Sequence, residues 1–137
     1  MADRIRKVTY YYTKVPNRPG AAARVLQALA GARVNLLAFT GFPSGASAQL
    51  DFIPVNGPAF VRAARKAKVR LSARKTGFLV SGPDRVGACS ALLDTLARAK
   101  INVTAIDAVT AGGGKYGALL WVKRRDLARA TRVLRAR

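Results

Sequence analysis

The chain has 137 residues, half of them hydrophobic, and its 25 Lys and Arg oppose only 6 acidic residues, all Asp, which gives a net charge of +19 at pH 7. It contains no His and no Glu. General acid–base catalysis and zinc or iron sites usually depend on His, Cys or paired carboxylates, so this composition argues against metallohydrolases and Ser-His-Asp hydrolases. We expect a protein that is not an enzyme and that binds no metal or cofactor.

The single cysteine, Cys89, excludes an intramolecular disulfide and is expected to be a small helical core residue. No apolar stretch approaches the ~20 residues that a membrane span requires, and the start of the chain has no signal-peptide core. These features predict a soluble cytoplasmic protein.

The first half of the chain is predicted to form three strands, two helices and a last short strand. Residues 8–15 are β-branched and aromatic, as a strand prefers. A Pro- and Gly-containing break precedes a helix at 20–32 with an apolar stripe. Asn56 is a candidate N-cap for the second helix. The remaining strands are expected at 35–42, 49–55 and 69–72.

The second half repeats this order. Strands are expected at 76–81, 102–109 and 116–122, with helices at 87–99 and from about 125 to about 134. The glycines at 112–114 and the following Lys115 lack the GK[ST] ending and the helix of a phosphate-binding loop. A flexible hairpin turn between two strands is the favoured interpretation.

An offset of 67 residues aligns the two halves without a gap. It superimposes Pro16 on Pro83, Gly20 on Gly87 and Leu29 on Leu96, among other pairs. The sequence therefore predicts two copies of one unit, residues 1–75 and 76–137. The expected fold class is α+β, with two tandem ferredoxin-like βαββαβ units, each an antiparallel sheet with its helices on one face.

The two copies differ at their ends. The equivalent of Val69 is residue 136, so the second copy has no room for its last strand before Arg137. At the same offset, residues 2–8 take the place of residues 69–75. We expect the N-terminal segment, or another subunit, to cover this sheet edge, because a bare edge promotes aggregation.

The break between first strand and helix carries a family resemblance. Val15-Pro-Asn-Arg-Pro-Gly-Ala, followed by a leucine-bearing helix and Val34-Asn-Leu, resembles the signature of ACT domains. Gly82-Pro-Asp-Arg-Val-Gly-Ala with Ile101-Asn-Val resembles it too, although Asp84 and Val86 depart from the pattern.

The resemblance implies a regulatory protein that binds an amino acid or related small carboxylate at interfaces between paired units. It implies two ligand-binding sets, which are Asn17, Arg18, Pro19, Gly20, Ala21 and Asn35 in the first copy, and Asp84, Arg85, Val86, Gly87, Ala88 and Asn102 in the second. Backbone N–H groups near each glycine suit a carboxylate, and Asn offers both a donor and an acceptor. The same glycines also fit a tight turn, and the Asn residues also fit the start of a strand.

The basic charge supports an alternative function. Each copy carries one basic cluster at its second helix that could bind nucleic acid electrostatically. The clusters are Arg62, Arg65, Lys66 and Lys68 in the first copy, and Arg124, Arg125, Arg129 and Arg132 in the second. A solvated helix face explains them as well. The favoured hypothesis is a freestanding, dimeric regulator that binds a small-molecule effector and has no membrane partner. A separate regulated enzyme is a further candidate partner.

Overall fold

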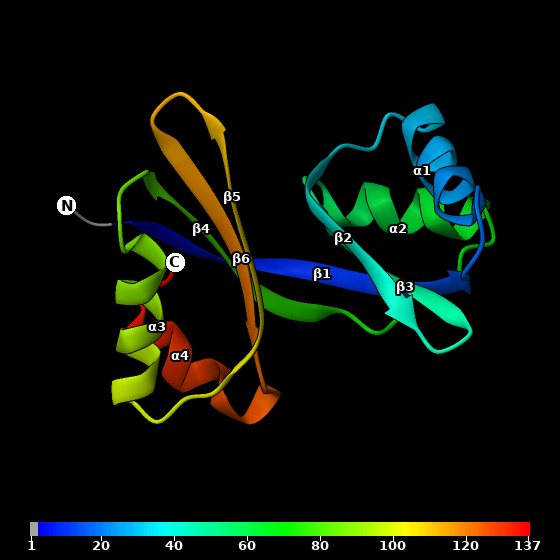
Figure 1. Ribbon diagram of the computed structural model, residues 1–137. Helices are drawn as coiled ribbons and strands as arrows, with labels where there is room; N and C mark the ends of the chain where they lie inside the picture. The colour runs from blue at the N-terminus through cyan, green and yellow to red at the C-terminus, as the bar shows by residue number, and fades with distance from the viewer. Residues whose placement is uncertain (1–2) are drawn as a thin grey trace. The chain divides into compact units, whose positions relative to one another are not determined.

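The computed structural model describes residues 3–137 (Figure 1). Met1 and Ala2, which the hypothesis for the N-terminal segment includes, lie outside the described residues. The chain divides into two compact units. The first unit is Thr9–Lys75, and the second unit joins the described residues up to Val8 to Thr76–Arg137. Strand β1 (Arg4–Pro16) contributes its beginning to the second unit and its end to the first.

The first unit is an antiparallel sheet with both helices on one face (Figure 1). After β1 come α1 (Ala21–Gly31), β2 (Leu36–Ser44), β3 (Ser47–Pro54) and α2 (Gly57–Lys66). The strand order is β2-β3-β1. The buried core joins sheet and helices through Tyr11, Leu29, Leu50, Phe52 and Phe60.

One predicted local feature of the first unit, the cap of its second helix, is confirmed. The Asn56 side chain caps α2 by accepting a hydrogen bond of 3.0 Å from the Ala59 N–H. Tyr11 is buried, and its ring stacks on that of Phe60 with centroids 5.5 Å apart. Because side chains alternate along a strand, Tyr10 and Tyr12 point to the opposite face of the sheet.

The predicted strand at residues 69–72 is wrong, because this segment is not a strand in the structure. It nevertheless runs beside β1. The Ser72 N–H donates to the Tyr12 oxygen at 2.8 Å, and the Thr13 hydroxyl donates to the Arg70 oxygen at 2.6 Å. Side-chain oxygens thus replace part of the backbone ladder, and the segment covers the edge without a regular strand.

The second unit repeats the arrangement. It contains β4 (Lys75–Pro83), α3 (Ala88–Arg98), β5 (Val103–Gly112), β6 (Lys115–Val122), a 3₁₀ turn (Arg124–Asp126) and α4 (Leu127–Val133). Its strand order is β1-β4-β6-β5, and α3 and α4 pack on one face (Figure 1). The glycine-rich segment forms the β5–β6 hairpin turn that the sequence predicts.

The beginning of β1 covers the sheet edge of the second unit. It lies beside β4, and Ile5 packs against the core of this unit. The Lys7 N–H donates to the Arg137 oxygen at 3.0 Å, and the Arg137 N–H donates to the Ile5 oxygen at 3.1 Å. The expectation that the N-terminal segment protects this edge is confirmed for residues 4–8.

Candidate functional site

The two loops of the predicted ligand sites have the same backbone geometry. Gly20 has φ 87° and Gly87 has φ 83°, and each precedes the first residue of a helix. This left-handed conformation favours glycine. A Cβ at either position would meet no atom within 4 Å. The glycines are therefore required by backbone conformation, and each leaves open space at a helix N-terminus.

Each loop is tied to the hairpin of its own unit. The Asn17 N–H donates to the Ala46 oxygen at 3.3 Å, and the Asp84 N–H donates to the Gly114 oxygen at 2.9 Å. At the 67-residue offset Asn17 corresponds to Asp84, and Ala46 corresponds to the residue just before Gly114. The two contacts are therefore equivalent to within one residue. They hold the backbone in place while the side chains of Asn17 and Asp84 remain exposed.

The asparagines of one predicted set lie at opposite ends of the sheet. Asn17 is next to the hairpin that begins at Ser44, whereas Asn35 precedes β2 and accepts from the Val55 N–H at 3.0 Å. The nine residues of β2 separate them by about 25 Å. The same holds for Asp84 and Asn102 across β5. A single unit therefore does not bring both residues to one small ligand.

The remaining predicted residues differ in exposure. Val86 is fully exposed, and Arg18, Pro19, Gly20 and Asn102 are exposed as well. Ala88 is the exception, because it is 7% exposed and belongs to the core of the second unit. Its side chain packs in the core beneath the loop and is therefore not accessible to a ligand.

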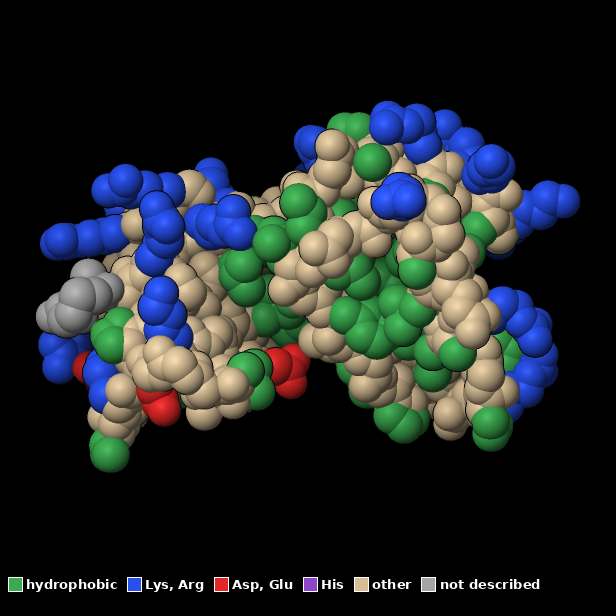
Figure 2. Space-filling model, turned by 90° about the horizontal axis from the view of Figure 1, so that it is seen from above, with side chains coloured by type: hydrophobic (Ala, Val, Ile, Leu, Met, Phe, Trp, Pro, Cys, Tyr) green, Lys and Arg blue, Asp and Glu red, His purple; other side chains and the backbone are tan. Residues whose placement is uncertain are grey.

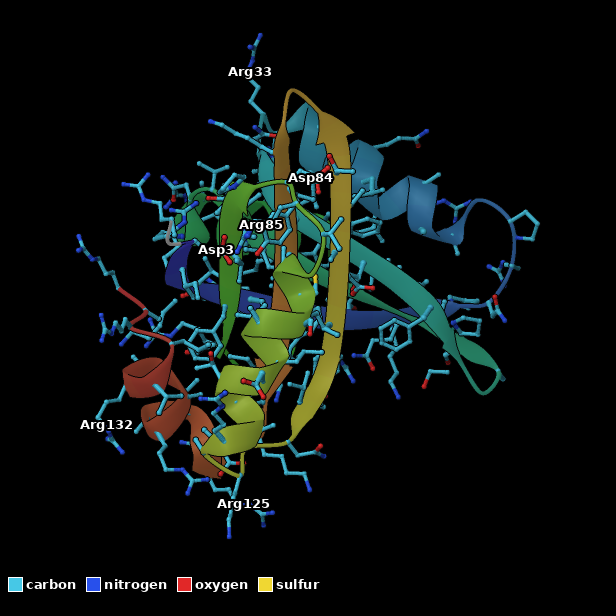
Figure 3. All side chains as sticks on the ribbon, turned by 60° about the vertical axis from the view of Figure 1, so that its left-hand side comes forward. Asp3, Arg33, Asp84, Arg85, Arg125 and Arg132 are labelled. Carbon is cyan, nitrogen blue, oxygen red and sulfur yellow. The ribbon has the colours of Figure 1, made fainter. Side chains whose placement is uncertain are left out.

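Arg85 is engaged by partners that the sequence analysis did not identify. It forms an ion pair with Asp3, with Nη1 to Oδ1 at 3.0 Å, and the Tyr116 hydroxyl donates to Asp3 Oδ2 at 2.7 Å. Figure 3 shows Asp3 and Arg85 pointing toward each other. Asp3 and Tyr116 are separated by 113 residues in the sequence, so no local pattern could reveal the cluster.

The cluster changes the acidity of its members. Burial alone would raise the pKa of Asp3, but the hydrogen bonds from Arg85 and Tyr116 outweigh it and hold this pKa below its ordinary value. Burial and the hydrogen bond to Asp3 raise the pKa of Tyr116 to about 12. Asp3 is therefore a carboxylate and Tyr116 a neutral phenol at pH 7.

Each loop borders a cavity in its own unit. Beside the second loop lies a cavity of about 320 Å³ that Asp84, Arg85, Thr110 and Tyr116 help to line. Beside the first loop lies one of about 400 Å³ that Arg18 and Ala21 help to line. Both volumes suit a small molecule.

The residues of the nucleic-acid alternative are surface residues. Arg62, Arg65, Lys66 and Lys68 are exposed on and after α2. Arg125 and Arg132 point into solvent (Figure 3), as does Arg33. Arg129 forms an ion pair with Asp126 at 3.2 Å, and Arg124 is exposed. Figure 2 shows many Lys and Arg side chains and few acidic ones on the face in view.

Two further classes of feature are absent from residues 3–137. This part of the chain contains no group of three or more His, Cys, Asp or Glu side chains placed to hold a metal ion. Among the same residues, no helix is both long and apolar enough to cross a membrane.

Comparisons with known proteins give a family match over part of the chain and a shared fold. Residues 12–70 match the family model of the ACT domain, and a search of curated protein sequences returns no match. A crystal structure of a protein from Bacteroides thetaiotaomicron has a TM-score of 0.82 at 16% identity, over 96% of this chain and 88% of that chain.

Two aspartate kinase structures share the fold as well. The ligand-free regulatory subunit of aspartate kinase from Thermus thermophilus has a TM-score of 0.66 at 15% identity, over 98% of this chain and 95% of that chain. A crystal structure of aspartokinase alpha and beta subunits has a TM-score of 0.62 at 20% identity, also over 98% of this chain and 95% of that chain. At such identities the likeness establishes the fold alone.

Proposed function

We propose that the chain is a regulatory protein that binds an amino acid or related small carboxylate, on the basis of the match of residues 12–70 to the family model of the ACT domain. The observation that carries the proposal is the pair of loops at Asn17–Ala21 and Asp84–Ala88. In each loop a left-handed glycine opens the N-terminus of an 11-residue helix. The first-turn N–H groups of such a helix favour a carboxylate.

The distance between Asn17 and Asn35 supports a dimeric arrangement for this function. One unit cannot direct both side chains to one amino acid, because a strand of nine residues lies between them. We propose that the loop of one protomer holds the ligand carboxylate while Asn35 of a second protomer binds the ammonium group. The fold shared with the regulatory subunit of an aspartate kinase is consistent with control of a separate enzyme by this chain.

The two loops are proposed to bind with unequal affinity. At the second loop Asp84 adds a negative charge, and Arg85 already forms an ion pair with Asp3. At the first loop Asn17 is neutral, and no ion pair to Arg18 is recorded among residues 3–137. A ligand carboxylate is therefore repelled less at the first loop.

A thermal-shift screen of the twenty amino acids tests this function. A ligand at a hundredfold excess over its dissociation constant adds about 2.7 kcal/mol to the free energy of unfolding. We expect one or a few amino acids to raise Tm, and Asn17→Ala to abolish the shift. Gln27→Ala, at an exposed position of α1 outside the loop, is the control and should retain it. No shift with any amino acid would contradict the proposal.

A further inference from the structure

The cavity beside the first loop is a cationic groove. We define the cationic groove by the basic side chains that line it, Lys14, Arg18, Arg24, Lys68 and Arg70. They come from the end of β1, the following loop, α1 and the segment after α2. The bottom of the groove is apolar and includes Val15, Val25, Ala28 and Val69.

Among residues 3–137, no acidic side chain lines the groove or forms an ion pair with its basic residues. Asp51 is the only acidic residue between Thr9 and Lys75. It is 5% exposed on β3, where it accepts hydrogen bonds from the Thr40 hydroxyl at 3.0 Å and the Gln49 amide at 3.1 Å. Among residues 3–137, the ion pairs of the structure involve Arg85, Arg98 and Arg129. The five cations of the groove are outside these pairs.

In the second unit, an aspartate neutralises the positive charge of the arginine that is equivalent to Arg18. At the 67-residue offset Arg18 corresponds to Arg85, which pairs with Asp3 from the segment beside β4. In the first unit the segment beside β1 brings Arg70 instead, since the Thr13 hydroxyl donates to the Arg70 oxygen. The segment that lies along the sheet edge, which we call the edge segment, therefore supplies the Asp3 carboxylate in the second unit and the Arg70 cation in the first.

Five like charges around one cavity of about 400 Å³ repel one another and attract anions. An amino acid does not balance them, because it carries one carboxylate and an ammonium group that the groove repels. A phosphate group carries a charge of about −1.5 to −2 and three acceptor oxygens. Its oxygens can accept from several guanidinium forks at once, and the groove offers three Arg.

We propose that the cationic groove is a binding site for a small phosphorylated molecule, which adjoins the amino-acid site of the proposed function and shares Arg18 with it. The phosphate is held by Arg18, Arg24 and Arg70, with Lys14 and Lys68 adding charge. The apolar bottom of the groove accepts the uncharged part of the molecule. Asn17 and Asn35 do not line the groove, so the two sites can be disabled independently.

Isothermal titration calorimetry of the full chain with pyrophosphate and with ADP, at constant ionic strength, tests the proposal. We expect saturable binding to one site that weakens as salt increases. Arg24→Ala keeps a good helix former at an exposed position of α1 and should weaken binding about tenfold or more. Arg70→Asp, which gives the edge segment an acid as in the second unit, should abolish binding.

Two controls separate this site from general charge and from the proposed function. Arg33→Asp changes the net charge as much as Arg70→Asp, but Arg33 points away from the chain (Figure 3) and does not line the groove. It should bind both probes like the wild type. Asn17→Ala should also leave phosphate binding intact. A thermal shift of the wild type with an amino acid, together with no binding of pyrophosphate or ADP to the wild type, would overturn the groove and leave the proposed function standing.

Three other results would overturn the proposal. Equal affinity for citrate would show that any multivalent anion suffices and that phosphate is not selected. Equal weakening by Arg33→Asp and Arg70→Asp would assign binding to net charge. If a DNA or RNA duplex binds but neither pyrophosphate nor ADP does, the groove is part of a nucleic-acid surface.

Discussion

The Arg85 guanidinium donates to both oxygens of the Asp3 carboxylate, with Nη1 to Oδ1 at 3.0 Å and Nη2 to Oδ2 at 3.3 Å. The Asp3 side chain is 11% exposed, and the Tyr116 hydroxyl completes its environment at 2.7 Å. Because Asp3 precedes β1 and Arg85 follows β4, this contact fastens the start of the chain to the second unit. It also occupies an arginine that the resemblance to ACT domains assigns to a ligand.

Asp3→Asn is expected to lower Tm at pH 7 and to lose its effect in acid. The pKa of Asp3 is lowered in the folded state relative to its ordinary value of 3.8. Its stabilisation is therefore complete above pH 3.8 and is lost as the pH falls through the folded value. Thermal unfolding from pH 7 to about pH 2 should show the gap between wild type and variant closing below pH 3.8.

Asp94→Asn is the control for this pH series. Asp94 forms an exposed helical ion pair with Arg98 at 2.9 Å, and its side chain is 56% exposed. Such pairs contribute little to stability, so Tm should change little at any pH. A gap between wild type and Asp3→Asn that stayed constant down to pH 2 would refute the role given to the Asp3 charge.

Tyr116→Phe removes the hydroxyl that donates to Asp3 while it keeps the ring in the core of the second unit. We expect the free energy of unfolding to fall by about 1.5–3 kcal/mol, as for a hydrogen bond to a charged group. Urea denaturation at pH 7 measures this. In the Asp3→Ala background the same substitution should cost much less, and an undiminished cost would show that the hydroxyl acts elsewhere.

Gly20→Ala tests the loop conformation that the proposed site requires. An alanine at φ 87° is strained even though its Cβ meets no atom within 4 Å. We expect a loss of about 1–2 kcal/mol in the free energy of unfolding. Gly57→Ala is the matched control, because Gly57 is also free of neighbours and begins α2 without a positive φ. Equal effects of both substitutions would mean that the left-handed conformation is not essential.

Local patterns of the sequence predict the elements well, since helix stripes and breaks depend on neighbouring residues. Leu29 and Leu96, matched by the repeat, are buried in equivalent places of the two units. The prediction of a strand at residues 69–72 is wrong because two of the hydrogen bonds between this segment and β1 use Ser and Thr hydroxyls in place of backbone groups.

The site is less predictable than the elements because it depends on pairs that are distant in the sequence. Asp3 and Arg85 are 82 residues apart, and only the position of β1 beside β4 joins them. The cationic groove likewise combines Lys14 with Arg70. The ligand roles of Asn17, Asn35 and their equivalents stay predictions, since one unit holds them at opposite ends of a strand.

Gly82→Ala is expected to disrupt the Asp3 cluster by direct contact. A Cβ on Gly82 would collide with the Asp3 carboxyl group, so the side chain must move away from Arg85 and Tyr116. The loss of stability should therefore exceed that of Gly117→Ala, the control, whose Cβ would meet only the Val80 oxygen at an ordinary 3.7 Å. Removing the obstructing group with Asp3→Ala should relieve most of the Gly82→Ala penalty. A double-mutant cycle by urea denaturation measures this coupling, and additive effects would show that Gly82 is not needed for the approach of Asp3.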